Sequence, residues 1–273
     1  MIGGAERRGG RALDTNREDL GPLLVEQFRQ QMNNLAAAIQ LLTPVVQEKA
    51  GAQYDPYLAI LHQSLYRMMR MVGSLEYLQL SPEDAAPRET TLDLAGLCRE
   101  LARQAAPLAE TAGVRFSWEE ETGSLLTHGD AGQLRRMLLN LVSNALRAAG
   151  DGGQAGMRLA RRDGRASITV WDTGAGWEPE PTEEELLRRP GSLGLGLQVA
   201  RRIAAAHGGS IVFQQQEERG SRAIVTLPIR PPEPGETLKT PSMGFDGSGG
   251  FSDVLVELSG VLPYRAFLPA DLE

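Results

Sequence analysis

Two stretches near the start of the chain repeat apolar residues at spacings of three and four, the period of an amphipathic helix. The first stretch runs through Leu24, Phe28, Met32, Leu35, Ile39, Leu42 and Val46, and the second through Leu58, Leu61, Leu65, Met68, Val72 and Leu75. Because a break at Gly51 to Pro56 separates them, residues 19–82 are predicted to form a helical hairpin. Pairing of two hairpins into a four-helix bundle would bury both apolar faces and favours a homodimer. The alternative is that both helices pack on the following domain of the same chain.

From residue 88 to residue 230, helical periods are mixed with the alternation typical of strands. Helices are predicted over 97–112, 130–148 and 195–206, and strands over 90–94, 114–119, 155–161, 165–172, 210–216 and 222–229. Asp130 is expected to cap the second helix, and the pair Asp163-Gly164 predicts a tight turn between two strands. This mixture favours an α+β fold, an α/β sandwich that follows the helical hairpin, over a doubly wound parallel sheet.

The ends of the chain differ in composition from these two predicted domains. Residues 1–18 are rich in Gly and Arg and are expected to be flexible, and the Pro-containing segment 81–88 predicts a linker. Residues 231–273 begin with a Pro-, Gly- and Ser-rich stretch and continue into a peptide at 253–268 in which apolar and polar residues alternate. The alternation predicts a strand that adds to a sheet edge or docks in a groove, with a loosely packed terminal segment as the alternative.

Charge and composition exclude several classes of protein. The net charge of −7 argues against nucleic-acid binding, which needs a basic excess. Cys98 is the only cysteine, so an internal disulfide and a multi-cysteine metal site are excluded. The sequence lacks the apolar core of a signal peptide and any stretch of about 18 apolar residues, so no membrane-spanning helix is predicted and a cytoplasmic location is expected.

The predicted helix 130–148 carries the first group of candidate binding residues. Asn140 and Asn144 lie four residues apart and Arg147 three further on, so two amides and a guanidinium share one helical face. Amide oxygens are suitable ligands for Mg²⁺, and arginine is suited to phosphate. Two asparagines on a helix face are also common as capping or surface residues, so this group alone does not identify a site.

A second candidate is the segment WDTGAGW at 171–177, directly after a predicted strand. The Asp172 carboxylate can accept a hydrogen bond from an exocyclic amine, and Gly174 and Gly176 allow the backbone to approach a flat ligand. The same pattern also occurs in ordinary turns.

The third candidate is GSLGLG at 191–196, which opens a predicted helix. Gly194, Leu195 and Gly196 would present backbone N–H groups to phosphate at the helix N-terminus. No βαβ unit surrounds the segment, so it is not a dinucleotide-binding fingerprint.

Read together and in this order, the three segments resemble the ATPase superfamily of DNA gyrase, the mismatch-repair ATPases and the histidine kinases, and most closely the histidine kinases. NLVSNALR at 140–147 resembles their N box, DTGAG at 172–176 and GLGL at 194–197 resemble their glycine boxes, and HGG follows at 207–209. The resemblance implies that residues 88–230 bind ATP and Mg²⁺.

The resemblance also implies a role for each matching residue. Asn144 would hold Mg²⁺, Asp172 would contact adenine, Gly174 and Gly176 would form the floor of the base pocket, and Gly194, Leu195, Gly196 and Arg147 would lie near the phosphates. Asn140 stands where gyrase-type members place a catalytic glutamate, so efficient hydrolysis by water is not implied.

The sequence departs from the family pattern in two places around the nucleotide. The segment 178–192, where the family has a lid, contains no Phe, and its basic residues Arg188 and Arg189 are candidates for a γ-phosphate contact or solvated surface arginines. The last glycine motif is reduced to Arg219-Gly220-Ser221.

A third departure concerns the phosphoacceptor histidine, which the family carries on the first hairpin helix. The matching stretch here is RQQMNNL, and the histidine position holds Arg29, which cannot act as a neutral nucleophile. Asn33 matches the family residue that helps to orient water during dephosphorylation of a response regulator. His62 is expected to be a solvated or half-buried residue beside the second apolar face, with a relocated phosphoacceptor as the minority alternative.

The resemblance therefore implies a protein like the two-component sensor histidine kinases, with ATP and Mg²⁺ as ligands. One hypothesis is a divergent kinase that phosphorylates His62 or a histidine of a partner. The other is a nucleotide-gated pseudokinase or phosphatase-type regulator that binds a response regulator or partner kinase without phosphotransfer. An anti-sigma-type serine kinase shares the ATPase fold, but the helical hairpin argues against it.

Overall fold

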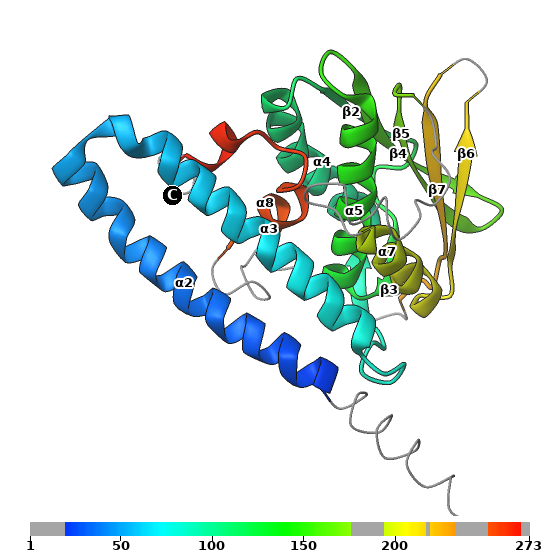
Figure 1. The fold of residues 1–273 in the computed structure, drawn as a ribbon. Helices are drawn as coiled ribbons and strands as arrows, with labels where there is room; N and C mark the ends of the chain where they lie inside the picture. Colours follow the sequence, from blue (N-terminus) through cyan, green and yellow to red (C-terminus); the bar gives the residue numbers. More distant parts are fainter. Residues whose placement is uncertain (1–19, 176–193, 217–218, 233–250, 269–273) are drawn as a thin grey trace, which may run out of the picture.

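The computed structural model describes residues 20–175, 194–216, 219–232 and 251–268. Helices α2 (Leu20–Ala50) and α3 (Asp55–Gln79) form an antiparallel hairpin through the short 3-10 helix η1 (Ala52–Tyr54), as the apolar periods predict (Figure 1). Gly51, at φ 78°, makes the break between them. No helix among the described residues is long and apolar enough to cross a membrane.

An α+β domain follows the hairpin and contains one large mixed sheet. Its five strands, in the spatial order β2-β4-β5-β7-β6, are β2 (Arg115–Glu120), β4 (Gln154–Arg162), β5 (Arg165–Asp172), β7 (Ser221–Pro228) and β6 (Ser210–Gln215). Strands β2 and β4 are parallel, and the other neighbours are antiparallel. Asp163 and Gly164 both have positive φ in the β4–β5 turn, which confirms the predicted tight turn.

Two short strands and three helices complete this domain. Strands β1 (Thr90–Asp93) and β3 (Leu126–Gly129) form a separate antiparallel pair. The helices are α4 (Leu94–Thr111), α5 (Ala131–Ala149) and α7 (Leu195–Ala206), and all three lie on one side of the sheet in Figure 1. Among the described residues of this domain, strand β3 is the element that the sequence analysis did not predict.

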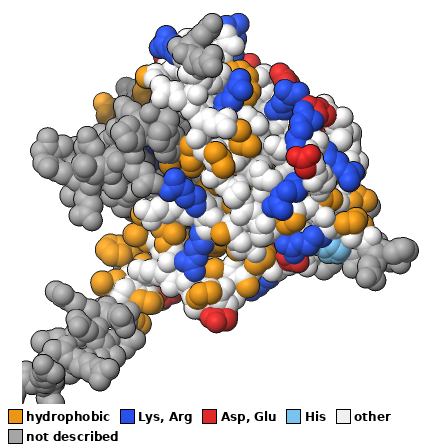
Figure 2. Space-filling view, turned by 90° about the vertical axis from the view of Figure 1, so that its right-hand side faces the viewer, with side chains coloured by type: hydrophobic (Ala, Val, Ile, Leu, Met, Phe, Trp, Pro, Cys, Tyr) orange, Lys and Arg blue, Asp and Glu red, His pale blue; other side chains and the backbone are white. Residues whose placement is uncertain are grey.

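The core of the domain lies between these helices and the sheet. It includes the fully buried side chains of Met137 and Leu138 from α5, Leu159 from β4 and Ile168 from β5. The opposite face of the sheet carries the alternate residues and has no helix from the described residues over it. Seen from the sheet side, basic and apolar side chains are interspersed (Figure 2).

The two hairpin helices have different surroundings. Helix α3 lies between α2 and the α+β domain (Figure 1). Its Leu65, Tyr66 and Tyr77 are buried. The alternative expectation, that both helices pack on the following domain, therefore holds for α3 but not for α2. Helix α2 contacts mainly α3 and leaves large apolar side chains of its predicted apolar face exposed, among them Phe28 at 59% and Leu42 at 56%. An apolar row of this size on a helix is typical of a surface that binds another protein.

The prediction of a strand in the peptide 253–268 was wrong. The segment forms helix α8 (Asp253–Leu258) and the 3-10 helix η2 (Tyr264–Phe267). The Ser252 side chain caps α8 by accepting the Leu255 N–H, and the helical turn brings Val254 and Leu258 onto one buried face. The alternative of loose packing was also wrong, because Phe267 is fully buried.

Candidate functional site

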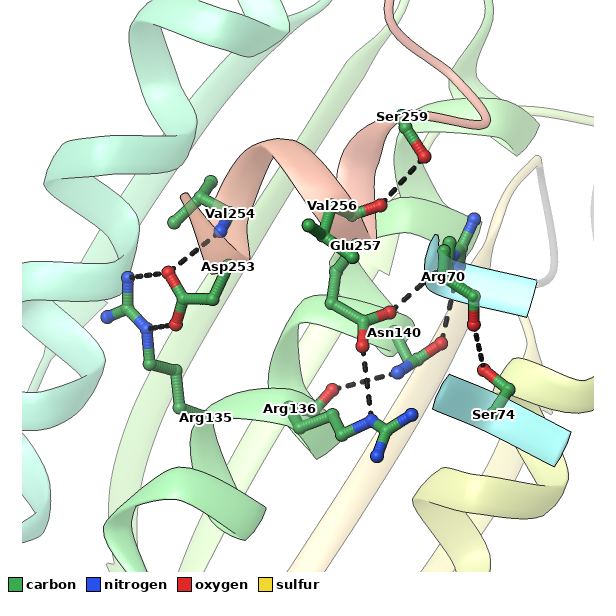
Figure 3. Close-up of polar contacts among 10 residues, drawn as sticks. All are labelled: Arg70, Ser74, Arg135, Arg136, Asn140, Asp253, Val254, Val256, Glu257 and Ser259. Atoms are coloured by element: carbon green, nitrogen blue, oxygen red, sulfur yellow. Dashed lines mark hydrogen bonds and ion pairs between the residues drawn. The ribbon is translucent and has the colours of Figure 1, made fainter. Parts of the chain in front are cut away.

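Helix α5 presents the two asparagines of the N-box motif on successive turns. The Asp130 carboxylate caps the helix as predicted and accepts the Gln133 N–H at 3.0 Å. Asn140 is completely buried: its Nδ2 donates to the Arg136 carbonyl at 3.0 Å, and its Oδ1 accepts from the Arg70 guanidinium at 3.3 Å (Figure 3). Asn140 is therefore fixed by α3 as well as by its own helix.

Asn144, one turn further along α5, has a different environment. Its Nδ2 is buried and has no hydrogen-bond partner among the described residues. An unpaired buried amide group destabilises a protein by about 1–3 kcal/mol, so this side chain has capacity for a partner that the described residues do not supply. Because the amide can present its oxygen instead after a half-turn, the side chain fits a hard cation. Arg147 is exposed in the last turn of the same helix.

The end of β5 places a buried carboxylate beside a close backbone approach. Asp172 is only 3% exposed; its Oδ1 accepts the Gly174 N–H at 2.8 Å, and its Oδ2 accepts the Ser221 hydroxyl. Gly174 packs so tightly on α5 that a Cβ there would lie 1.9 Å from the Ala148 carbonyl oxygen. Only glycine fits this position, which explains the first glycine of the motif.

The shortened motif at residues 219–221 lies against the same carboxylate. Gly220 has φ 102°, and a Cβ on it would lie 2.0 Å from the Asp172 carbonyl oxygen. Arg219 Nε donates to the Gly174 carbonyl at 3.2 Å. Ser221 and Arg219 thus support Asp172 and Gly174, a role that the sequence did not predict. The only signal was the remnant of a glycine motif.

The N-terminus of α7 lies against Asn140. Gly194 precedes the helix with φ 69°, and Leu195 is half-buried at its first position. A Cβ on Gly196 would lie 2.3 Å from Asn140 Oδ1, so the second glycine motif meets the N-box helix at close range. The remaining predicted residues of this region, Gly176, Arg188 and Arg189, lie outside the described residues.

Comparisons with known proteins agree with this arrangement. Residues 129–231 match the family described as histidine kinase-, DNA gyrase B-, and HSP90-like ATPase. Histidine protein kinase DivJ of Caulobacter vibrioides is 29% identical over 65% of this chain and 31% of its own length. Sporulation kinase D of Bacillus subtilis is 27% identical over 74% of this chain and 40% of its own length. Residues 129–231 thus form a histidine kinase-like ATPase domain, and the chain as a whole is similar to sensor histidine kinases.

The fold is shared with solved histidine kinase structures. Full-length ShkA in complex with AMPPNP superposes with a TM-score of 0.62 at 24% identity, covering 79% of this chain and 47% of that one. The histidine kinase ThkA in complex with the response regulator TrrA gives 0.53 at 22% identity, covering 84% and 69%. The chain spans between about a third and two fifths of the curated relatives named above.

Within this histidine kinase fold, the position expected to hold the phosphoacceptor is a surface ion pair. Arg29 Nη1 lies 3.0 Å from Glu76 Oε1 on α3, and the same guanidinium also contacts Glu26 on α2. All three side chains are well exposed, so the pairs contribute little to stability. Asn33, one turn further along α2, is exposed.

His62 is buried, and the expectation of a solvated or half-buried residue was wrong. Its Nε2 lies 3.2 Å from the Thr43 hydroxyl, which itself donates to the Ile39 carbonyl at 2.8 Å. The hydroxyl proton is used in that bond, so His62 is the donor to Thr43 and its Nε2 carries a proton. Burial lowers the pKa of His62, so the neutral ring is favoured.

Proposed function

We propose that this histidine kinase-like protein binds ATP and Mg²⁺ where α5, the end of β5 and the N-terminus of α7 meet. The observation that carries the proposal is the pairing of the buried Asp172 carboxylate with the close backbone approach at Gly174. Asp172 would accept the exocyclic amine of adenine, and Gly174 would border the base. ATP would supply the phosphoryl group, and Mg²⁺ would neutralise its charge.

The metal would be held by Asn144. This assignment is supported by the unpaired amide of that residue, on the same face of α5 as Asn140, whose amide is hydrogen-bonded at both its nitrogen and its oxygen. Arg147 and the N-terminus of α7 at Gly194 to Gly196 would contact the phosphates, because a guanidinium and a helix N-terminus both favour anions.

The surroundings of the two candidate phosphoacceptor positions favour a regulator over a kinase that phosphorylates its own hairpin. Arg29 occupies the phosphoacceptor position and is held in ion pairs, and His62 is buried against Thr43. A nucleophile must reach the γ-phosphorus atom, and neither side chain meets that need. We therefore propose a nucleotide-gated protein that binds a response regulator or a partner kinase. Transfer to a histidine of a partner is the second candidate, which the buried Asp172 carboxylate and the close backbone approach at Gly174 favour.

The exposed apolar row on α2 supports a homodimer built by two hairpins. Burying such a row is favourable by roughly 25 cal/mol per Å² of apolar surface. Sedimentation of the wild type and of Phe28→Glu tests this, since Phe28 belongs to the row, is exposed, and its substitution leaves the domain core untouched. A monomeric wild type would contradict the dimer.

Calorimetric titration with Mg²⁺ and ATP tests the nucleotide site. We expect the wild type to bind and Asn144→Ala to lose at least about tenfold in affinity, because one ligand interaction corresponds to 1.4 kcal/mol or more. Asn33→Ala is the matched control, since it makes the same substitution on the exposed surface of α2. A wild type that binds no ATP would contradict the proposed function.

The same Asn33→Ala variant tests the phosphatase-type role. We expect it to remove any dephosphorylation of a phosphorylated response regulator while ATP binding stays unchanged. Incubation with γ-labelled ATP and a partner kinase whose own ATP site has been inactivated separates the two candidates: label on the partner supports transfer by this protein, and an unlabelled partner supports the regulator. An unchanged dephosphorylation rate in Asn33→Ala would exclude the role of Asn33.

A further inference from the structure

The C-terminal residues 251–268, here named the C-terminal clamp, pack where three helices meet. The clamp contacts α3, α4 and α5, although it follows the ATP-binding domain in sequence (Figure 1). Its apolar residues Leu258 and Phe267 are fully buried. The Tyr66 ring of α3 is central to the contact, with its centroid 5.4 Å from that of Phe251 and 5.3 Å from that of Phe267. The clamp is therefore part of the core.

A row of long polar side chains on α3 binds the clamp. Gln63, Arg67 and Arg70 are spaced by four and three residues, so they lie on one face of α3. Gln63 donates to the Leu262 carbonyl at 2.7 Å, and Arg67 to the Ser259 carbonyl at 3.0 Å. These carbonyls lie at and beyond the C-terminal end of α8, where a helix leaves its carbonyl groups without internal partners.

Glu257 joins the hairpin to the ATP-binding domain. It is 5% exposed and accepts from Arg70 Nε of α3 at 3.3 Å and from Arg136 Nε of α5 at 3.2 Å (Figure 3). One buried carboxylate therefore holds arginines of two domains. Removing one member of a buried ion-pair network leaves an uncompensated buried charge. The Glu257 carboxylate and its two arginine partners therefore depend strongly on one another.

The bridge continues into the proposed nucleotide site. Arg70, held by Glu257, also donates to Asn140 Oδ1, against which Gly196 of α7 packs. A second ion pair, between Asp253 and Arg135, fastens the other end of α8 to α5. The ATP-binding domain cannot turn away from α3 while the clamp stays docked, because these bonds would break.

We propose that the C-terminal clamp locks the ATP-binding domain onto helix α3 of its own hairpin and that its release frees the domain to move. Glu257 is the residue that fastens it. The inference goes beyond the proposed function and does not depend on nucleotide binding. Phosphoryl exchange with a partner requires the nucleotide to approach that partner, so a docked clamp would restrain it.

Hydrogen–deuterium exchange on the full chain tests the clamp. We expect Glu257→Gln to speed amide exchange at least about tenfold in residues 254–262 and in the facing part of α3, because local opening becomes easier. Glu121→Gln is the matched control: Glu121 also bridges two arginines, Arg158 and Arg162, but at the exposed edge of the sheet. The control should leave both segments unchanged.

A second variant guards against general unfolding. If Glu257→Gln also speeds exchange in β4 and β5, Arg67→Ala decides, since it removes the bond to the Ser259 carbonyl without changing the buried carboxylate. Unchanged protection of the clamp and α3 in both variants would overturn the proposal, as would a wild-type clamp that exchanges like an unfolded peptide. ATP binding is measured in parallel. Its absence would contradict the proposed function, while the exchange rates still decide on the clamp.

Discussion

Replacing the Asp172 carboxylate by an amide should separate nucleotide binding from folding. A carboxylate offers about four lone-pair positions. The protein uses one for the Gly174 N–H and one for the Ser221 hydroxyl. In Asp172→Asn the remaining oxygen can still accept from Gly174, and the new NH₂ group can donate to the Ser221 oxygen once that hydroxyl rotates. The interactions with the protein survive, while the exocyclic amine loses its charged acceptor: only one neutral lone pair remains, on the oxygen that also accepts from Gly174.

The size of the effect follows from the charge of the acceptor. A hydrogen bond to a charged group contributes about 1.5–3 kcal/mol. With about 1.4 kcal/mol for each factor of ten, the Kd for Mg²⁺-ATP should rise roughly 10- to 150-fold. The unfolding free energy should change by less than about 1 kcal/mol, because both bonds to Asp172 keep a partner.

Calorimetric titration measures the Kd for Mg²⁺-ATP, and thermal unfolding measures stability. Both are applied to the wild type, Asp172→Asn and Ser221→Ala. Ser221→Ala is the matched control, since it removes a bond to Asp172 but leaves the carboxylate free to accept. We expect it to destabilise the fold by about 1 kcal/mol and to weaken ATP binding less than about fivefold. A folded Asp172→Asn protein that binds ATP within about twofold of the wild type would refute the assignment of Asp172 to the base.

Three further changes test the structure around the site. Gly174→Ala places a Cβ 1.9 Å from the Ala148 carbonyl oxygen, so overpacking should destabilise by about 1–3 kcal/mol and abolish ATP binding in the same two assays. Asp130→Ala removes the cap bond to the Gln133 N–H and should lower the unfolding free energy in urea by about 1 kcal/mol. Burial lowers the pKa of His62 in the folded state. The contribution of His62 to the unfolding free energy is therefore complete above the unfolded-state pKa of 6.5 and falls as the pH drops below that value. Urea titrations on both sides of that pH should show a smaller acid-induced loss for His62→Gln.

Elements with a strong local signal were predictable from the sequence. Helix α7 was predicted with its observed bounds, because glycines precede it and HGG ends it. Strand β3 has four residues and forms only by pairing with β1, so its own sequence carries little signal. Helix α8 has six residues, too few for a period of 3.6 to be distinguished from alternation.

The site could be predicted only as far as its residues lie close together in sequence. Asp172 and Gly174 form one motif, and the structure places them in direct contact. Arg70 and Glu257 were not predicted, because 70 and 117 positions separate them from Asn140. For His62, exposure depended on the partner helix: Thr43 of α2 covers it, and no pattern within α3 reports that contact.

One rigid helix carries both the proposed nucleotide residues and the anchors of the clamp. Arg136, Asn140 and Asn144 occupy successive turns of α5, so a shift that loosens Glu257 from Arg136 also moves the two asparagines. Two sites linked in this way must affect each other equally in binding free energy. The factor by which Mg²⁺-ATP changes the docking equilibrium of the clamp must equal the factor by which clamp docking changes ATP affinity. Exchange rates of residues 254–262 with and without Mg²⁺-ATP measure the first factor, and the ATP affinities of the docked and released states measure the second. If both factors equal one, α5 does not transmit any coupling between the two sites.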